Sequence, residues 1–403
     1  MDTHKTISFS PPDITEDEIE AVAAVLRSGW ITTGPRTKEL EGRLRAFTHS
    51  DGFACFSSAT AAEECILRAL GIGPGDEVIT SAYTYTATAS VICHVGATPV
   101  LCDTAPGSFE MDYAALPGLI NERTKAIIPI DIAGRMCDYD ALFDAIHAAH
   151  APWSPRTALQ KCFDRPIVIT DGAHSLGATR HGAAAGSVAD FTTFSFHAVK
   201  NFTTAEGGGL AWRAGSFDSD ELYQQMMLFS LHGQTKDALS KSCAGAWEYD
   251  IAFPGWKYNM TDIQAAIGLV QLDRYPALLA RRRELIERYS ANLAAAPLTL
   301  LAHYGDTFAS SGHLMLTRIN GASTEVRNAL IEHLGAAGVA ANVHYKPLPM
   351  MTAYKALGFD IADFPHAYAQ YANEITLPLH TLLSDEDVDY VCDALQKALA
   401  VCM

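Results

Sequence analysis

The sequence predicts an α/β protein in which helices cover both faces of a mainly parallel sheet, followed by a smaller C-terminal α/β domain. Short β-rich runs alternate with helical stretches between residues 77 and 170, which is the rhythm of parallel strands joined by helices. A long helical stretch at residues 274–295 then leads into a second alternating region. We therefore expect a large domain at residues 1–275, including an N-terminal helix, and a small domain at residues 276–403.

Each predicted element has a local signal. The capping box Thr15-Glu16-Asp17-Glu18 opens a first helix, which Gly29 ends. Helical periodicity predicts further helices at residues 39–47, 61–70, 86–94, 138–150, 263–272, 274–295, 324–337 and 385–400. Apolar, β-rich runs predict strands at residues 77–79, 98–101, 125–132, 166–170, 191–196, 313–319 and 339–344. The poorly patterned residues 151–165 contain two prolines and are expected to form a surface loop.

The composition bears on the class of protein. The net charge of −17 argues against nonspecific nucleic-acid binding, which needs a basic surface. The nine cysteines include no CxxC pair, which favours free thiols in a reducing cytosol over a zinc site. The polar N-terminus has no apolar signal core, and no apolar run approaches ~20 residues. We therefore expect a cytoplasmic protein without a membrane span.

Lys200 is the first candidate for a catalytic group. It follows the apolar run at residues 191–196 and precedes a glycine-rich return into another strand at residues 207–209. A lysine in such an uncharged segment is expected to lie in a partly dry pocket, where desolvation lowers its pKa. The neutral amine is then a nucleophile suited to Schiff-base chemistry. A lysine that only caps a strand and extends into water explains the local pattern equally well.

Two other segments precede Lys200. Asp171-Gly172-Ala173-His174-Ser175 follows a β-rich run 29 residues before Lys200, and Ser57-Ser58-Ala59-Thr60-Ala61 leads into a helical stretch. A carboxylate favours a protonated pyridine nitrogen, and the free N–H groups at a helix start favour a phosphate. An amine, a carboxylate and a phosphate cradle are the parts that a pyridoxal-phosphate (PLP) site requires. Taken alone, Asp171 is better explained as a turn cap and Ser58 as an ordinary N-cap.

Four further segments extend this pattern over nearly the whole chain. They are Ser28-Gly29-Trp30-Ile31-Thr32-Thr33-Gly34, Gly73-Pro74-Gly75-Asp76-Glu77-Val78-Ile79, Tyr258-Asn259-Met260-Thr261-Asp262 and His344-Tyr345-Lys346-Pro347. Together with the segments around Lys200 and Asp171, they resemble the fold-type I PLP enzymes, in particular the nucleotide-sugar aminotransferases of the DegT/StrS type. The resemblance implies a three-layer α/β/α large domain and PLP as the cofactor.

The resemblance implies a role for each residue near the cofactor ring. Lys200 matches the lysine of the family's F-[ST]-F-H-x-x-K motif, which forms the Schiff base and moves a proton between the amino donor and the cofactor. Asp171 matches the aspartate that pairs with the ring nitrogen, and His174 is placed to touch the ring or its 3′ oxygen. Gly172 departs from the family pattern, where alanine is common. We expect no metal at Asp171 and His174, because no further ligands lie nearby.

The resemblance also implies a phosphate site and a ring contact. Ser58, Ala59 and Thr60 match the family's phosphate-binding motif, and Ser195 adds a hydroxyl. Tyr85 matches the aromatic residue that stacks on the ring, although a core aromatic residue at a strand end would give the same pattern.

Four residues concern the partner subunit and the substrate. Asn259 matches an asparagine that reaches the phosphate of the neighbouring subunit, so the resemblance implies a homodimer with shared active sites. His344 and Tyr345 match the family's HY-x-P element and are candidates for substrate contact. Lys346 either meets a diphosphate or is solvated.

The implied reaction transfers the amino group of L-glutamate (or glutamine) to a keto-sugar, in particular a nucleotide-linked keto-deoxysugar. A cyclitol or another cyclic ketone is an alternative acceptor. A non-catalytic relative that senses the cofactor or a sugar is the alternative from another class of protein. The lysine, the aspartate and the phosphate motif are all present, which favours the enzyme.

Overall fold

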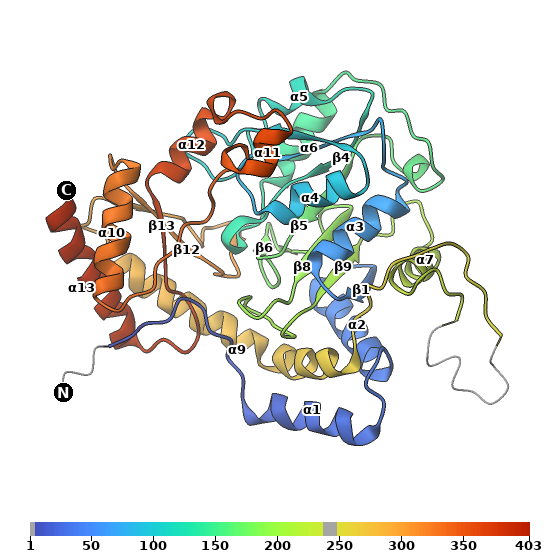
Figure 1. The fold of residues 1–403 in the computed structure, drawn as a ribbon, viewed down its shortest axis with the longest axis horizontal. Coiled ribbons are helices and arrows are strands. Elements are labelled where there is room, and N and C mark those ends of the chain that lie inside the picture. Colours follow the sequence, from blue (N-terminus) through green and yellow to red (C-terminus); the bar gives the residue numbers. More distant parts are fainter. Residues whose placement is uncertain (1–4, 237–247) are drawn as a thin grey trace.

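The computed structural model describes residues 5–236 and 248–403, and the statements below concern this part of the chain (Figure 1). Its centre is a seven-stranded sheet with the strand order β1-β9-β8-β5-β4-β2-β3. Strand β9 pairs antiparallel with β1 and β8, whereas the other neighbours pair in parallel. The strands are β1 (Gly52–Phe56), β2 (Glu77–Ser81), β3 (Thr98–Cys102), β4 (Thr124–Ile128), β5 (Ile167–Asp171), β8 (Phe191–Ser195) and β9 (Gly208–Trp212). The predicted mainly parallel sheet is confirmed.

Helices cover both faces of this sheet (Figure 1). One core cluster joins the sheet to α2, α6 and α9, and a second joins it to α3, α4 and α7. The helices are α1 (Glu16–Ser28), α2 (Pro35–Thr48), α3 (Ala59–Ala69), α4 (Thr86–His94), α5 (Leu116–Leu119), α6 (Tyr139–Ala148), α7 (Ser219–Ser230), α9 (Asp262–Asn292), α10 (Thr324–Ala336), α11 (Thr352–Ala356), α12 (Pro365–Ala372) and α13 (Asp385–Cys402).

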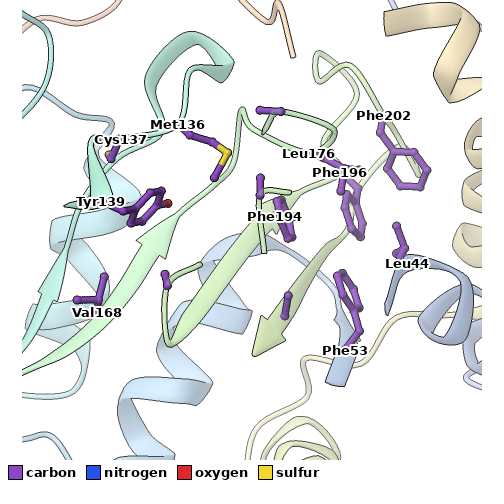
Figure 2. Close-up of a cluster of buried hydrophobic side chains, with 14 of the residues drawn as sticks. Leu44, Phe53, Met136, Cys137, Tyr139, Val168, Leu176, Phe194, Phe196 and Phe202 are labelled. Carbon is purple, nitrogen blue, oxygen red and sulfur yellow. The ribbon is translucent and has the colours of Figure 1, made fainter. Parts of the chain in front are cut away.

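The two clusters follow from the alternation of side chains along each strand. In β4, Ile127 belongs to the first cluster and Ile128 to the second, and Val168 of β5 lies with Ile127. Figure 2 shows part of the first cluster, in which the ring of Phe194 stacks on that of Phe53 and the ring of Phe196 meets that of Phe202 edge-on. Because both faces of the strands are buried, they read as continuous apolar runs in the sequence.

A smaller antiparallel sheet lies beyond the large one, with the order β10-β12-β13 (Leu298–Leu300, Met315–Ile319 and Glu374–Leu377). It shares a third core cluster with α10, α13 and the second half of α9. A short sheet of β11 (Phe308–Ala309), β6 (Thr179–Arg180) and β7 (Ala183–Ala184) connects the two regions. Helix α9 runs through the predicted boundary at residue 275, so the division into two domains stays a proposal.

Helix α9 corrects the prediction of two helices at residues 263–272 and 274–295. It is one continuous helix that contains Pro276. A proline inside a helix removes one backbone hydrogen bond and costs about 3 kcal/mol. The buried face nevertheless continues through Leu272, Tyr275 and Leu278 on both sides of the proline, and this packing offsets the cost.

The prediction of a strand at residues 339–344 is wrong. Val339 and Asn342 each form one isolated bridge, to Ile7 and Thr376 respectively, so no continuous ladder develops. The strand predicted at residues 125–132 corresponds to β4, which ends four residues earlier than predicted, at Ile128.

Two prolines explain the shifted ends of predicted elements. β4 ends at Ile128, because Pro129 has no N–H group to donate. Helix α2 begins at Pro35, four residues earlier than predicted, because proline is favoured in the first turn of a helix.

Two further observations concern the class of protein. The eight cysteines within the described ranges are free thiols, whereas Cys243 and the first four residues of the polar N-terminus lie outside these ranges. No helix in the described ranges is both long and apolar enough to cross a membrane.

Candidate active site

A cavity of about 360 Å³ opens near the carboxyl ends of the central strands. Ligands of parallel sheets bind at this edge, and the volume lies within the range of small-molecule sites. All the predicted site residues except one line it: Ser58, Ala59, Thr60, Tyr85, Asp171, His174, Ser195, Lys200, His344 and Tyr345. The exception is Asn259. The fold therefore brings residues that are up to 287 positions apart in the sequence into one cavity.

Lys200 lies on the loop between β8 and β9, five residues after Ser195 ends β8. Its backbone N–H group donates a hydrogen bond of 2.9 Å to the carbonyl of His197, which fixes this turn. Desolvation lowers the pKa of the Lys200 amine to about 8, although Asp171 acts in the opposite direction. About a tenth of the amine is therefore neutral at pH 7, far more than for an ordinary lysine. The side chain reaches the cavity instead of capping the strand.

Asp171 is the last residue of β5 and is only 8% exposed. The Thr88 hydroxyl of α4 donates to its Oδ2 at 2.6 Å, and the Ala173 N–H group donates to its Oδ1 at 3.1 Å. These two donors hold the carboxylate in one orientation. A Cβ atom at Gly172 would lie 2.8 Å from Thr192 Cγ2, so alanine does not fit here without a shift. This crowding explains the departure from the family pattern.

The first turn of α3 forms an anion site beside these groups. Ser58 is the N-cap, and its Oγ accepts a hydrogen bond of 3.0 Å from the N–H group of Ala61. No described residue accepts a hydrogen bond from the Ser58 hydroxyl or from the N–H groups of Ala59 and Thr60, so these donors can meet an anion. Gly208 of β9 packs directly against this turn, because a Cβ atom there would lie 2.2 Å from the backbone nitrogen of Ala59.

Aromatic and imidazole rings surround the opposite side of the cavity. Tyr85 is 59% exposed and its ring lies 6.1 Å from that of Tyr345, so the alternative of a core aromatic residue is wrong. His174 Nδ1 accepts a hydrogen bond of 3.1 Å from the Ala133 N–H group, and its Nε2 lies 3.2 Å from the Tyr345 hydroxyl. Burial holds the pKa of His174 well below its usual value, so this ring is neutral at pH 7.

His344 is fixed from three sides. The Tyr83 hydroxyl donates to its backbone carbonyl at 2.8 Å, and its N–H group donates to Glu374 Oε2 at 2.8 Å. The ring stacks on Phe9, with 5.6 Å between the ring centroids. Phe9 thus brings the N-terminal segment to the cavity wall.

Asn259 is not among the residues that line the cavity of its own chain. Its Nδ2 donates to Thr33 Oγ1 at 2.6 Å, and its backbone pairs with Phe56 at the end of β1. A role of Asn259 at the site of a partner subunit stays a prediction.

Several cavity residues escaped the sequence analysis, among them Phe9, Ser10, Glu63, Glu206 and His313. Glu63 is buried, its Oε1 has no hydrogen-bond partner in the described part of the chain, and burial raises its pKa well above the usual value. The one available signal was its position three residues after Thr60, on the first turns of α3. Phe9 gave no local signal, since it lies far from the motifs in sequence.

Within the described ranges, no group of three His, Cys, Asp or Glu residues is placed to hold a metal ion.

Comparisons with known proteins agree with this geometry. The family model of the DegT/DnrJ/EryC1/StrS aminotransferase family matches residues 12–396. The spore coat polysaccharide biosynthesis protein SpsC of Bacillus subtilis (strain 168) is 35% identical over 394 residues, which cover 97% of this chain and 96% of that protein.

The similar solved structures are also aminotransferases. The putative sugar aminotransferase Spr1654 from Streptococcus pneumoniae, in its PMP form, is 55% identical with a TM-score of 0.96, covering 99% of this chain and 100% of that one. Its PLP form is 54% identical with the same TM-score and the same coverage. Helicobacter pylori PseC, an aminotransferase involved in the biosynthesis of pseudoaminic acid, is 29% identical with a TM-score of 0.87, covering 98% of this chain and 100% of that one. The chain therefore belongs to the DegT/DnrJ/EryC1/StrS aminotransferase family, as a PLP-dependent aminotransferase of fold type I.

Proposed function

We propose that this aminotransferase moves the amino group of L-glutamate (or glutamine) to a keto-sugar, in particular a nucleotide-linked keto-deoxysugar. The observation that carries the proposal is the convergence of Lys200, Asp171 and the first turn of α3 on one cavity. These three elements supply an amine, a fixed carboxylate and an anion site, which is the donor set that PLP needs. When bound, PLP withdraws electrons from the carbon that bears the amino group and carries this group between the two substrates.

The residues have separate tasks in this proposal. Lys200 holds the cofactor through its amine and, once displaced, accepts and returns the proton of the reacting carbon. Asp171 keeps the ring nitrogen protonated, and the Thr88 hydroxyl keeps Asp171 in place. Ser58, Ala59, Thr60 and Ser195 hold the phosphate through N–H and O–H groups. Tyr85 and His174 border the cofactor ring.

The sugar is proposed from the opposite wall of the cavity and from the relatives. Phe9 and Tyr85 offer apolar faces, whereas the Tyr345 hydroxyl and His344 Nε2 offer hydrogen bonds, a combination that suits a sugar ring. SpsC is named for spore coat polysaccharide biosynthesis and PseC for the biosynthesis of pseudoaminic acid, which supports a role in polysaccharide biosynthesis here. We further propose a homodimer in which Asn259 completes the phosphate site of its partner.

The experiment that tests this function is reverse transamination with the purified, PLP-loaded protein. A panel of nucleotide-linked amino sugars, free amino sugars and aminocyclitols is offered with 2-oxoglutarate, and the formation of glutamate is measured. We expect turnover with at least one nucleotide-linked amino sugar and none in Lys200→Ala. Turnover with aminocyclitols alone would identify a cyclic ketone, and not a sugar, as the amino acceptor. Ligand binding without any turnover would favour the non-catalytic relative that senses the cofactor or a sugar.

A further inference from the structure

A buried chain of hydrogen bonds lies behind His344, on the side away from the cavity. Glu374 and Thr376 are both fully buried on β13. Thr376 Oγ1 lies 2.6 Å from Glu374 Oε1 and 2.9 Å from His344 Nδ1. The second carboxyl oxygen, Oε2, accepts the N–H group of His344 at 2.8 Å. One carboxyl group therefore contacts both the backbone and, through Thr376, the ring of a residue at the cavity.

The other ring nitrogen of His344, Nε2, is available to a ligand in the cavity. In the described part of the chain, Nε2 of His344 makes no hydrogen bond, and the side chain lines the cavity close to Lys200. Desolvation and Lys200 lower the pKa of the His344 ring to about 4, so the ring is neutral above about pH 5. A neutral imidazole carries its proton on one nitrogen only, and the bond made by the other nitrogen decides which one.

We propose that Glu374, acting through Thr376, sets which nitrogen of His344 carries the proton, and thereby whether His344 donates or accepts a hydrogen bond on the substrate side of the cavity. Glu374 is thus a positioning residue, and His344 is the group that meets the substrate. That the contacted oxygen belongs to a keto-sugar rests on the proposed function, whereas the tautomer of His344 does not.

The two states differ by one proton. When Glu374 is protonated, its O–H group donates to Thr376, Thr376 donates to His344 Nδ1, and Nε2–H points into the cavity as a donor. When Glu374 is ionised, Thr376 donates to the carboxylate and accepts from Nδ1–H, and Nε2 becomes an acceptor. The proton of Glu374 passes to Thr376, that of Thr376 passes to Nδ1, and Nε2 releases its proton to the cavity.

The surroundings of Glu374 favour the protonated state at pH 7. Arg327 of α10 donates to the backbone carbonyl of Glu374 and does not pair with its carboxyl group. Arg318 of β12 lies opposite in the sheet, but its Nε donates to Asn373. Among the described residues, the hydroxyls of Tyr83 and Tyr345 also lie close enough to interact with the charge of Glu374.

Together, burial and these neighbouring groups bring the titration of Glu374 into a pH range that can be studied in solution. Burial raises its pKa to about 8, although the hydrogen bonds from Thr376 and His344 and the charge of Arg327 act in the opposite direction. We therefore expect His344 to present Nε2–H below pH 8 and a bare Nε2 above it.

The direct test is ¹⁵N NMR of the PLP-loaded protein labelled at histidine, with the His344 signals assigned by their loss in His344→Asn. The ¹⁵N shifts of the two ring nitrogens show which one is protonated. We expect the proton to move from Nε2 to Nδ1 with a midpoint near pH 8. A His344 tautomer that stays the same from pH 6 to pH 9.5 overturns the proposal, whatever the behaviour of any variant.

Matched variants separate the effect of the hydrogen-bond chain from Glu374 through Thr376 to His344 from a general disturbance of the structure. In Glu374→Gln the amide oxygen accepts the His344 N–H group and the NH₂ group donates to Thr376, so Nε2–H is expected over the whole pH range. Thr376→Val removes the link at nearly constant volume and should abolish the change near pH 8, and Thr376→Ser should restore it. A Glu374→Gln protein that titrates like the wild type refutes the role of Glu374.

Kinetics test the substrate side of the proposal. A lost hydrogen bond weakens binding by about threefold to tenfold, so the KM for the amino acceptor should rise by this factor between pH 7 and pH 9 in the wild type. Glu374→Gln should lack this rise, which separates it from the titration of Lys200, because Lys200 is unchanged in that variant. A tautomer change without any difference in KM between the two proteins contradicts contact of His344 with the substrate.

Discussion

At the scale of single residues, burial determines the chemistry of the cavity. Lys200, His174 and His344 all have lowered pKa values because their charged forms lose hydration, and Glu63 has a raised one. Asp171 instead receives two directed donors. The sequence predicts the Lys200 and Asp171 segments because apolar strands precede them. For Glu63 it offers only the position three residues after Thr60, because the burial of Glu63 depends on how α3 packs against the sheet.

The pH dependence of cofactor attachment follows from Lys200. The neutral amine is the reactive form, and its fraction grows as the pH rises through a pKa of about 8, instead of through the ordinary lysine pKa of 10.5. We expect the rate at which the apoprotein takes up PLP covalently to rise with pH and to level off above pH 9, when followed by stopped-flow absorbance. A rate that still rises steeply beyond pH 10 would show that Lys200 is an ordinary solvated lysine.

The bond from Thr88 to Asp171 gives a second prediction at this scale. Thr88→Val removes a donor from a buried carboxylate, which costs about 2 kcal/mol, and should raise the PLP dissociation constant by tenfold or more. Thr88→Ser should keep most of the affinity. The matched control is Thr192→Val, since the Thr192 hydroxyl is buried without a partner in the described part of the chain. Equal losses in the Thr88→Val and Thr192→Val proteins would refute a specific role of Thr88.

At the scale of elements, the anion site depends on the close approach of β9 to the first turn of α3. The sequence predicts helix α3 and its N-cap from local signals, and these predictions are confirmed. It does not predict that Gly208, 150 positions later, provides the space for this turn. The two elements that were predicted wrongly have the same cause. The continuous helix α9 and the isolated bridges at residues 339–344 both depend on packing partners that are distant in the sequence.

Gly208→Ala tests this approach. Its Cβ atom would lie 2.2 Å from the Ala59 nitrogen, so β9 and α3 must move apart. We expect a dissociation constant for PLP at least tenfold higher, measured by fluorescence titration, and a loss of about 1 to 3 kcal/mol in the free energy of unfolding. Gly335→Ala is the control and should be neutral or slightly stabilising, because Gly335 is an exposed position of α10 and its Cβ atom would have no described atom within 4 Å. Unchanged PLP affinity in Gly208→Ala would mean that the phosphate of PLP does not bind at the first turn of α3.

At the scale of the whole molecule, the protein is acidic, with a net charge of −17, yet its proposed ligands carry phosphates. Local groups must therefore bind these anions, because the overall field repels them. The first turn of α3 provides such groups within one chain. Asn259 lies outside the cavity of its own chain, which is the arrangement expected if it serves a partner. The sequence predicts this contribution only through the resemblance, because no local pattern specifies a partner.

Hybrid dimers test the proposal that two subunits share each active site. Lys200→Ala and Asn259→Ala are each expected to have low activity. A mixture of the two, refolded or co-expressed, should regain up to about a quarter of the wild-type activity, because half of the dimers then contain one intact site. Mixing two preparations of Lys200→Ala is the control. A mixture no more active than the better of its two components would mean that the two residues do not act across an interface.

The proposed chemistry requires one lysine of this chain, Lys200, to hold the cofactor. Reduction of the PLP-loaded protein with borohydride fixes the cofactor to the side chain that bears it, and peptide mapping by mass spectrometry identifies that side chain. We expect a single labelled peptide with the cofactor on Lys200, and no label in Lys200→Ala. A cofactor found on any other residue, or an unlabelled protein, would contradict it.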